Sequence, residues 1–494
     1  MLAILILLIL LPVLSAVVIL ALRPTAVRVI AAATAAVTLG LAVWAVTQAF
    51  PGTVSYVFGQ MPWLKELEPV GLFGVLLDPL ASLALIVIIG VGFLAALFST
   101  AYVSDRNREH ALGEGQQRYY FWLLLLIASM VGVALSPNLL QLFIFWELST
   151  LCSWVLIAHT QEEKTMRAGF KALIVTHIGG LFYLVAPFIL FIATRSFGFT
   201  AAAKLAPGLK NLVFLFLLIA AWAKAAQIPF HTWLPDAHAE APSPISAMLS
   251  GVIVKVAVYA LARIVTAFYV SGTGVGVAAV GLVAAIMALV TMFMALILYF
   301  AQDDLKRLLA YSTIAHLSLI LLGIGMGILG SGLAFRGSVL HMITHAFAKT
   351  TLFLCAGAVV YTTGTRSISQ ISGLGRKLPL VGVAFVIGVL ALTGVPPLGC
   401  FWSKFYLLAG TLQVAGGLGP VTLALVLLES LVSFAWMLRV TQKVFLGEPS
   451  EPVLAIQGTP LPAAMTVVLS VLIAMCVLAP AVGIPLVARI PYLP

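Results

Sequence analysis

The sequence has few charged residues. Of its 494 residues, 9% are charged, whereas soluble domains contain about 25%. Hydrophobic residues make up 62% of the chain, against about 45–50% in soluble domains. This composition excludes an ordinary soluble protein and predicts a polytopic membrane protein that is embedded in a lipid bilayer.

Cysteine and the common cofactor motifs are also scarce. The four cysteines, Cys152, Cys355, Cys400 and Cys476, lie far apart without disulfide or metal-site spacing, so we interpret them as small core residues. The sequence lacks a CxxC motif, a nucleotide-binding glycine motif and a nucleophile elbow, so we expect no cofactor or metal on this chain. The net charge of +10 does not indicate a nucleic-acid partner, because the basic residues are explained by membrane topology.

Apolar runs of about 20 residues, each long enough to span a bilayer as a helix, recur along the chain. We therefore expect an all-α polytopic membrane protein with about 14 transmembrane helices. The longest polar connections, 50–77, 101–118 and 445–461, are predicted to be loops. The predicted spans are 2–22, 26–49, 78–103, 119–136, 138–159, 169–194, 211–230, 244–267, 274–300, 305–329, 333–362, 378–411, 417–444 and 462–487.

The basic residues outside the span interiors predict the orientation. Fifteen fall on one side of the predicted topology, and six on the other. By the positive-inside rule the rich side faces the cytoplasm, so both termini are expected on the outer side of a cell (inner or plasma) membrane. The rich side carries Arg23, Arg28, Arg106, Arg108, Arg118, Lys164, Arg167, Lys171, Lys306, Arg307, Arg366, Arg376, Lys377, Arg439 and Lys443. The poor side carries Lys65, Arg195, Lys204, Lys210, Arg336 and Arg489.

Two spans contain internal breaks, QIPFHTWLP in span seven and TGVPPLGCFW in span twelve. Each break has an interior lysine close by, Lys224 and Lys404 respectively. Broken helices at matching places in two halves are typical of inverted-repeat transporters. We expect four regions: helices one to three in 1–118, two inverted five-helix repeats in 119–267 (spans 4–8) and 274–444 (spans 9–13), and helix fourteen in 445–494.

Ionisable residues inside the spans are the candidate functional residues. A charge at mid-membrane costs about 2.5–3.5 kcal/mol on insertion scales and usually faces a bundle interior or a water-filled cavity. We interpret Glu147 as the only carboxylate deep in a span, with Lys224 as its partner. An ion pair that locks two helices is the alternative, but it does not explain four interior lysines. The other candidates are Lys255, Lys349, Lys404, His177, His316, His341 and His345.

A buried lysine can relay protons if its pKa falls from about 10.4 toward neutrality. Desolvation and neighbouring positive charge lower the pKa, and a paired carboxylate raises it. A lysine that gains and loses such a partner is therefore expected to act as a proton switch.

The segment HMITHAFAKT places His341, His345 and Lys349 at i, i+4 and i+8, on one helical face. We interpret this face as a polar stripe that carries protons between the other interior lysines. Three alternatives stay open: a zinc site, which lacks a third ligand and a catalytic glutamate; a haem site, with His316 as facing ligand; and histidines that are simply satisfied in the core. His231 and His238 flank the first break, where freed backbone groups need partners.

Five segments together resemble one family of membrane subunits. They are FWELS, KAAQIPFHTWLPDAHAEAPSPISAMLSGVIVK, DDLKRLLAYSTIAH, HMITHAFAKTTLFL and GVPPLGCFWSKF, and the resemblance covers about residues 75–445. The chain resembles the antiporter-like proton-pumping subunits of respiratory complex I (NADH-quinone oxidoreductase), membrane-bound [NiFe]-hydrogenase, formate hydrogenlyase and Mrp-type cation/proton antiporters. Lys404 and Ala226 depart from one complex I branch, which has a glutamate and usually a proline at these places, and AEAPSPISAMLSGVIVK is most similar to the hydrogenase-type and related subunits.

The resemblance implies fourteen helices in two inverted five-helix repeats, with helices seven and twelve broken. It also implies a role in proton translocation for each matching residue. These are Glu147 as the helix-five glutamate, Lys224 as its helix-seven partner, Lys255 as the central lysine, His341, His345 and Lys349 as the relay, and Lys404 as the terminal group that releases the proton.

The implied function is proton (or cation/proton) translocation within a multisubunit energy-converting redox complex. The implied partners are other membrane subunits, including paralogous antiporter-like ones, and a peripheral redox arm. Flavin, iron–sulfur clusters or [NiFe] would lie only on those partners, and this chain would carry no redox active site. Two alternatives stay open: a Mrp-type secondary Na⁺/H⁺ antiporter subunit without redox chemistry, and a non-conducting structural subunit.

Overall fold

The computed structural model describes residues 1–58, 73–110, 114–270, 277–456 and 461–491. Within these ranges, thirteen helices are long and apolar enough to cross a membrane, which confirms the all-α polytopic class. The remaining predicted span, 378–411, consists of the two shorter helices α14 and α15.

The first half of the chain contains α1 (Leu2–Ile19), α2 (Pro24–Ala49), α3 (Pro79–Tyr102), α4 (Gln116–Leu135), α5 (Leu139–Ile157), α6 (Glu163–Thr194), α7 (Pro207–Lys224), α8 (Trp233–Glu240), α9 (Ser243–Gly251) and α10 (Val256–Val270). The second half contains α11 (Ala278–Phe300), α12 (Leu305–Ile328), α13 (Gly332–Thr363), α14 (Pro379–Thr393), α15 (Gly399–Thr411), α16 (Leu418–Phe445), α17 (Glu451–Leu454) and α18 (Ala463–Ala488). Short 3₁₀ turns lie at Phe199–Lys204, Ile253–Lys255 and Leu374–Arg376.

Several helices begin at residues that satisfy the free amide groups of the first turn. The side chains of Asp78, Asn138, Asp304 and Ser331 accept hydrogen bonds from backbone N–H groups at the starts of α3, α5, α12 and α13. Proline begins α3, α7 and α14, where its missing N–H costs nothing. These start signals agree with the predicted span boundaries within a few residues.

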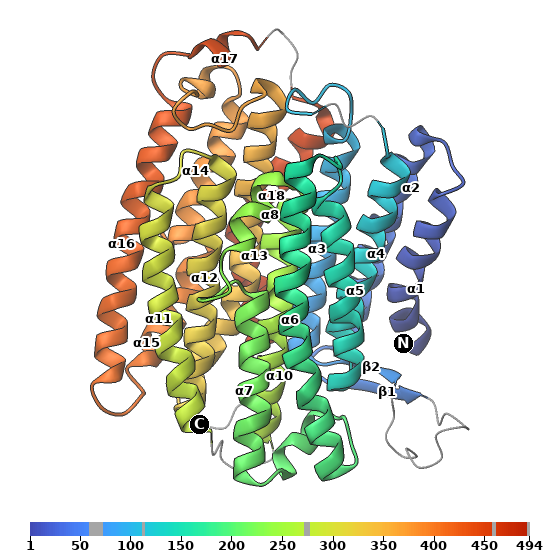
Figure 1. Cartoon of the computed structure of the whole chain (residues 1–494), viewed down its shortest axis with the longest axis vertical. Helices are drawn as coiled ribbons and strands as arrows, with labels where there is room; N and C mark the ends of the chain where they lie inside the picture. Colours follow the sequence, from blue (N-terminus) through green and yellow to red (C-terminus); the bar gives the residue numbers. More distant parts are fainter. Residues whose placement is uncertain (59–72, 111–113, 271–276, 457–460, 492–494) are drawn as a thin grey trace.

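The helices form one bundle with α12 and α13 in its interior (Figure 1). Nearly all of α12 and α13 is buried, whereas α1 and α16 bury only a minor part of their surface. Helix α13 packs against α9, α12, α14, α15 and α18. The interior histidines and two of the interior lysines are therefore held among neighbouring helices, away from lipid.

The predicted loop 50–77 is partly wrong. Strands β1 (Val54–Phe58) and β2 (Phe73–Leu77) form an antiparallel pair there. The side-chain amide of Gln141 accepts from the Gly74 backbone N–H and donates to its C=O, both at 2.9 Å, which ties the hairpin to α5. Lys65 of the predicted topology lies outside the described residues.

Three helices are interrupted inside the bundle, although the sequence predicts only two breaks. Helix α7 ends at Lys224 and α14 ends at Thr393, as QIPFHTWLP and TGVPPLGCFW indicate. The third interruption separates α9 from α10 at Val252–Lys255. Predicted span eight is therefore two helices, and Lys255 lies at their junction.

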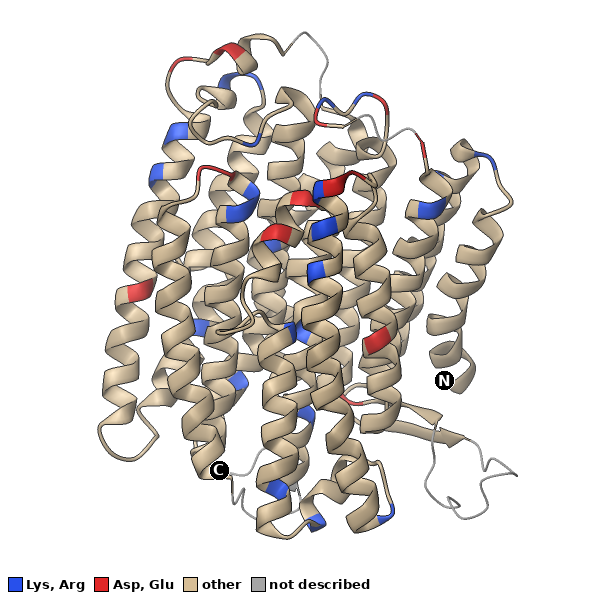
Figure 2. Ribbon diagram, in the orientation of Figure 1, with Lys and Arg blue, Asp and Glu red and all other residues tan. Residues whose placement is uncertain are grey.

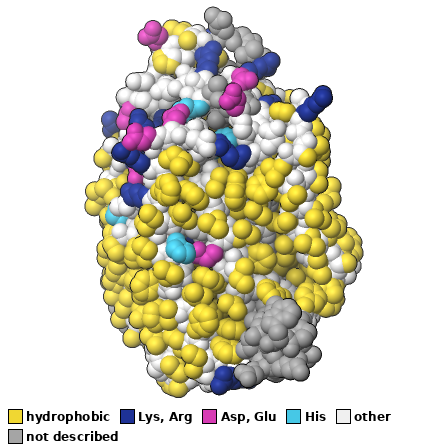
Figure 3. Space-filling model, turned by 45° about the vertical axis from the view of Figure 1, so that its right-hand side comes forward, with side chains coloured by type: hydrophobic (Ala, Val, Ile, Leu, Met, Phe, Trp, Pro, Cys, Tyr) yellow, Lys and Arg dark blue, Asp and Glu magenta, His cyan; other side chains and the backbone are white. Residues whose placement is uncertain are grey.

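Charge and hydrophobicity divide the molecule along its long axis. Figure 2 shows basic and acidic positions gathered toward one end, while both chain ends lie toward the other. Figure 3 shows hydrophobic side chains covering the surface between the two ends. The surface is that of a bundle immersed in lipid. The division into two inverted repeats stays a prediction.

Candidate functional site

Lys224 is the last residue of α7, and its side chain is fully buried. The helix stops because Pro229 lacks an N–H and its ring would clash with the carbonyl four residues earlier. The Lys224 ammonium donates to Thr150 Oγ1 at 2.6 Å and lies 5.5 Å from the centre of the Trp146 ring. The freed Ala223 carbonyl accepts from Trp233 Nε1 at 2.9 Å, so this carbonyl at the break is satisfied by a side chain.

The predicted ion pair between Glu147 and Lys224 is wrong as a direct contact. Among the described residues, the ionic partner of Glu147 is His177 of α6, with Oε2 and Nδ1 2.7 Å apart. Lys224 instead reaches Thr150, one turn along α5 from Glu147. The two groups share one face of α5 without touching, because helix rotation, which the sequence does not specify, turns Glu147 toward α6.

The Glu147–His177 pair lies at the outer surface of the bundle. The side chain of His177 is 53% exposed, and that of Glu147 is 19% exposed. The expectation that His177 lies in the interior is therefore wrong. Figure 3 shows a histidine against an acidic side chain in the middle of the hydrophobic surface. An ionisable pair at this depth is costly when it faces lipid.

Gly180 makes room for the Glu147 carboxylate. A Cβ atom at Gly180 would lie 2.1 Å from Glu147 Oε1. We expect Gly180→Ala to leave the helices folded, since a side-chain end can shift, but to separate Glu147 from His177. If the chain moves protons, as its resemblance implies, proton uptake by the reconstituted complex should fall about tenfold or more, since a misplaced transfer group loses efficiency steeply. The control is Gly208→Ala, where an added Cβ meets nothing within 4 Å. Equal uptake by the two variants would contradict the prediction.

Lys255 binds the carbonyl end of the interrupted helix. Its ammonium donates to Ser250 O and Gly251 O, both at 2.8 Å. These carbonyls end α9, and the C-terminus of a helix favours a cation. A cavity of about 20 Å³ lined by Lys255, Tyr259 and apolar side chains adjoins the break. This volume is enough for about one water molecule.

The predicted stripe on α13 meets a histidine from α12. His316 Nδ1 lies 3.0 Å from His341 Nε2, and the two rings stack. The ring of His345 lies 5.1 Å from that of His316, and neither of its buried nitrogens has a partner among the described residues. Lys349 donates to Leu309 O at 2.9 Å and to Ser312 Oγ. The structure thus brings together four groups that the sequence selects.

Lys404 follows the break between α14 and α15. Gly394 ends α14 in the left-handed conformation, which glycine adopts without strain, and two prolines follow it. The Lys404 ammonium donates to the freed Thr393 carbonyl at 3.2 Å and to Ser430 Oγ at 3.0 Å. The neighbouring Ser403 Oγ lies 2.8 Å from His341 Nδ1. The histidine cluster therefore adjoins the second break directly.

Hydroxyl groups of α12 connect these groups. Ser312 accepts from Lys349, and Thr313 bonds Ser250 at 2.9 Å, next to the carbonyls that hold Lys255. Ser318 donates at 2.7 Å to Gln227, which lies in the break after Lys224. The segment AYSTIAHLS carries all of these groups, and the signal is visible as polar residues in an apolar helix. The sequence reasoning selected only its histidine.

The remaining candidates lie near the first break. His238 is fully buried against the Phe353 ring, with centroids 4.4 Å apart, and both of its nitrogens lack partners among the described residues. His231 has a buried Nδ1 in the same condition. The His238 ring therefore satisfies no freed backbone group among the described residues, whereas the His231 ring interacts with the Pro229 backbone inside the break. Neither ring is part of the hydrogen-bonded row described above.

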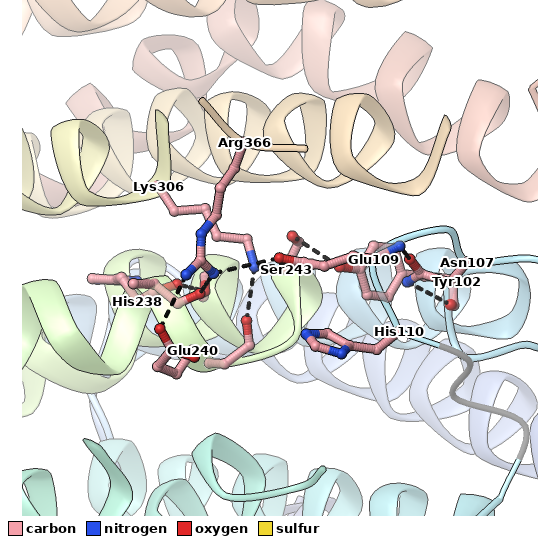
Figure 4. Close-up of polar contacts among 12 residues, drawn as sticks. Tyr102, Asn107, Glu109, His110, His238, Glu240, Ser243, Lys306 and Arg366 are labelled. Carbon is pink, nitrogen blue, oxygen red and sulfur yellow. Dashed lines mark hydrogen bonds and ion pairs between the residues drawn. The ribbon is translucent and has the colours of Figure 1, made fainter. Parts of the chain in front are cut away.

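A second polar cluster closes the charged end of the bundle (Figure 4). Arg366 pairs with Glu109, Glu240 and Asp304, and buried Lys306 lies 3.7 Å from Glu109. Burial disfavours the charge of Arg366, but Asp304, Glu240 and Glu109 outweigh it and raise its pKa. Figure 4 shows Arg366 and Lys306 reaching into the same group from above, with His238 alongside. The cluster connects the loops and helix ends that carry these five residues.

A sequence profile described as NADH:quinone oxidoreductase/Mrp antiporter, transmembrane, matches residues 136–433. This match covers more than half of the chain and includes Glu147 and every ionisable residue from Lys224 to Lys404 described above. The chain belongs to this family. A second profile, described as the N-terminus of chain 5 of NADH-ubiquinone oxidoreductase (complex I), matches residues 71–120.

Curated relatives of this antiporter-like family include two quinone oxidoreductase subunits. The chain is 33% identical over 415 residues to NAD(P)H-quinone oxidoreductase subunit 5 of Anthoceros angustus chloroplasts, covering 78% of this chain and 52% of that one. It is 31% identical over 396 residues to NADH-quinone oxidoreductase subunit N of Desulforudis audaxviator, covering 79% and 75%. The chain thus spans about half the length of its chloroplast relatives.

Two solved structures have the same fold. A chain of the Mrp complex from Dietzia sp. DQ12-45-1b gives a TM-score of 0.85 at 29% identity, over 99% of this chain and 51% of that one. A chain of the membrane-bound sulfane sulfur reductase, described as an archaeal respiratory membrane complex, gives a TM-score of 0.83 at 26% identity, over 99% and 98%. The second neighbour matches this antiporter-like chain over almost its whole length.

One carboxylate of this antiporter-like subunit, Glu429, is not among the residues that the sequence analysis selects. Glu147 was expected to be the only carboxylate deep in a span, but Glu429 lies within α16 and is 3% exposed. Its signal, a lone acid in LALVLLESLVSF, is as clear as that of Glu147. Within the described residues no group of three or more His, Cys, Asp or Glu could hold a metal ion. The four cysteines are free and buried.

Proposed function

We propose that this chain translocates protons, or exchanges them for another cation, as a membrane subunit of a multisubunit energy-converting complex. The observation that carries the proposal is the interior row from Lys224 through Lys255, the histidine cluster and Lys349 to Lys404. The row passes three helix breaks inside a bundle whose surface is apolar. Ionisable groups at such depth typically mark ion pathways.

The contacts of the four lysines support a proton relay rather than a set of ion pairs that only hold helices together. Three of the four lysines bind backbone carbonyls, and Lys224 binds a hydroxyl, so none has a carboxylate within 4.0 Å among the described residues. A lock would place an acid against each lysine. Carbonyls and hydroxyls hold an ammonium without fixing its charge, as a proton relay requires.

Neighbouring membrane subunits are part of the proposal. The outward Glu147–His177 pair is surrounded by the exposed apolar side chains of Ile174, Ile178 and Leu181. Covering this face by another membrane helix would remove the cost of exposing an ionisable pair to lipid. We place paralogous antiporter-like subunits on such faces, and we place a peripheral redox arm, with any flavin, iron–sulfur cluster or [NiFe] centre, on separate chains.

The orientation follows from charge. The end of the bundle that is rich in basic residues is proposed to face the cytoplasm, and the end that holds both termini is proposed to face outward (Figure 2). The membrane is proposed to be the inner or plasma membrane of the cell.

A second candidate function is exchange of Na⁺ for H⁺ without redox chemistry. The structural similarity to a chain of a Mrp complex supports it. The same row would then be driven by the proton gradient, and the partners would be small membrane subunits only.

Purification of the tagged chain with its native partners tests both functions. We expect iron–sulfur or nickel-containing partners by mass spectrometry and metal analysis, and we expect dye-reported proton uptake into vesicles when a reductant is added. Small membrane partners alone, with proton movement driven only by a Na⁺ gradient, would indicate the second function. An assembled complex that moves no protons under either condition would overturn both.

A further inference from the structure

The end of the row at α16 contains a buried carboxylate with no assigned role. Glu429 lies near the middle of α16 and is buried. Ser433 donates to Glu429 Oε1 at 2.6 Å, and Ser430 donates to Oε2 at 3.4 Å. A carboxylate at this depth is retained where it is paired or functional.

The hydrogen bonds connect Glu429 to Lys404. The Lys404 ammonium donates to Ser430 Oγ at 3.0 Å, and the same hydroxyl donates to the carboxylate. The three groups thus form one donor chain that runs from the ammonium to the carboxylate. Among the described residues there is no direct Lys404–Glu429 ion pair within 4.0 Å, so the hydroxyl is the connection that the structure provides.

The surroundings of Glu429 are polar but incompletely bonded. Tyr299 of α11 interacts with Ser433 and electrostatically with Glu429. Thr422, two turns before Glu429 on α16, has a buried hydroxyl without a hydrogen-bond partner among the described residues. Buried polar atoms in this state usually bind water or become bonded in another state. The site therefore has the capacity to accept a further hydrogen bond.

The other end of the row has a similar arrangement. Lys224 donates to Thr150, and Glu147 lies three residues earlier on the same helix. Lys404 donates to Ser430, and Glu429 lies one residue earlier on α16. In each case a lysine beside a helix break reaches a hydroxyl next to a carboxylate on the adjacent helix. The row is therefore terminated by a lysine and a carboxylate at both ends.

We propose that Glu429 is a proton acceptor of the translocation row and exchanges a proton with Lys404 through Ser430. The Lys404 ammonium gives one proton to Ser430 Oγ, while the hydroxyl proton of Ser430 passes to Glu429 Oε2. An ammonium and a carboxylate become a neutral amine and a carboxylic acid, and the net charge stays zero. The proposal rests on the proposed proton translocation and adds a terminal acceptor to it.

The test uses the purified complex in vesicles. Glu429→Gln is expected to lower proton uptake per assembled complex about tenfold or more, because a positioned proton-transfer group contributes about 10²–10⁴-fold. Glu429→Asp keeps the carboxylate and should recover part of the uptake. The matched control, Glu451→Gln, changes an exposed acid and should behave as wild type.

The outcomes separate the two proposals. If wild type moves no protons, the proposed function fails. If wild type moves protons and Glu429→Gln does so within about twofold of it, the role of Glu429 is overturned. If Glu429→Gln does not assemble, Ser430→Ala decides, because it keeps the carboxylate and removes only the connecting hydroxyl: reduced uptake supports the proposal, and normal uptake overturns it.

Discussion

Lys224→Met is expected to lower proton translocation by about 100-fold or more while the complex still assembles, since a positioned proton-transfer group contributes about 10²–10⁴-fold. Methionine approximates the length of lysine and keeps the packing against Trp146, so the variant removes the ammonium and little else. Without the ammonium, the Thr150 hydroxyl loses the hydrogen bond that it accepts from Lys224, and the row loses its ionisable group at the first break. Proton uptake into vesicles, normalised to complex content, measures the effect.

Lys164→Met provides the control, since Lys164 is exposed at the start of α6. It should retain wild-type uptake. A purely structural role for Lys224 predicts the opposite pattern, in which less complex assembles but each assembled complex moves protons normally. Unchanged uptake by Lys224→Met would contradict the role assigned to this lysine.

Gly337→Val is expected to prevent accumulation of folded protein. A Cβ at Gly337 would lie 2.4 Å from the backbone nitrogen of Leu407, so α13 and α15 touch through their main chains here. Main-chain atoms inside a bundle cannot move without displacing a whole helix. Overpacking a core lowers the stability of the folded protein by about 1–3 kcal/mol or more. Any α15 that did fold would be displaced, carrying Lys404 away from Ser430. Yield and thermal stability in detergent measure the outcome.

Gly40→Val is the matched control for this substitution. Gly40 also lies within a transmembrane helix, but an added Cβ there meets nothing within 4 Å. Both variants carry the same loss of glycine and the same bulk. If the two proteins were equally stable, the close approach of α13 and α15 would not be important for folding.

Much of the fold could be predicted because hydrophobic length and proline act locally. The apolar runs define the spans, and Pro229 and Pro396 lie in the two breaks that the sequence predicts. The break at Val252 has no such signal, since its segment SGVIVK contains no proline. It depends on the Lys255 ammonium binding the end of α9, which is a contact between side chain and backbone that no local preference indicates.

The candidate site could likewise be predicted only in part from the sequence. Membership of the row follows from finding an ionisable residue in an apolar span, and that argument applies to Glu429 as much as to Glu147. Pairing does not follow, because it depends on how each helix is rotated and on which neighbour it packs against. His177 binds Glu147, and Ser312 binds Lys349, through contacts between consecutive helices whose relative rotation the sequence does not specify. Roles for these residues stay predictions until uptake is measured.

The Lys255 ammonium stands where a continuous helix would present two peptide N–H groups to Ser250 O and Gly251 O. An uncharged amine offers fewer donors and a weaker field, so loss of the proton frees those carbonyls for renewed winding of α9 into α10. The number of helical residues in this span would then depend on whether Lys255 is protonated. Protonation of Lys255 would thereby change the length of the α9–α10 span along the membrane normal. Amide hydrogen exchange at Val252–Val256 measures this change.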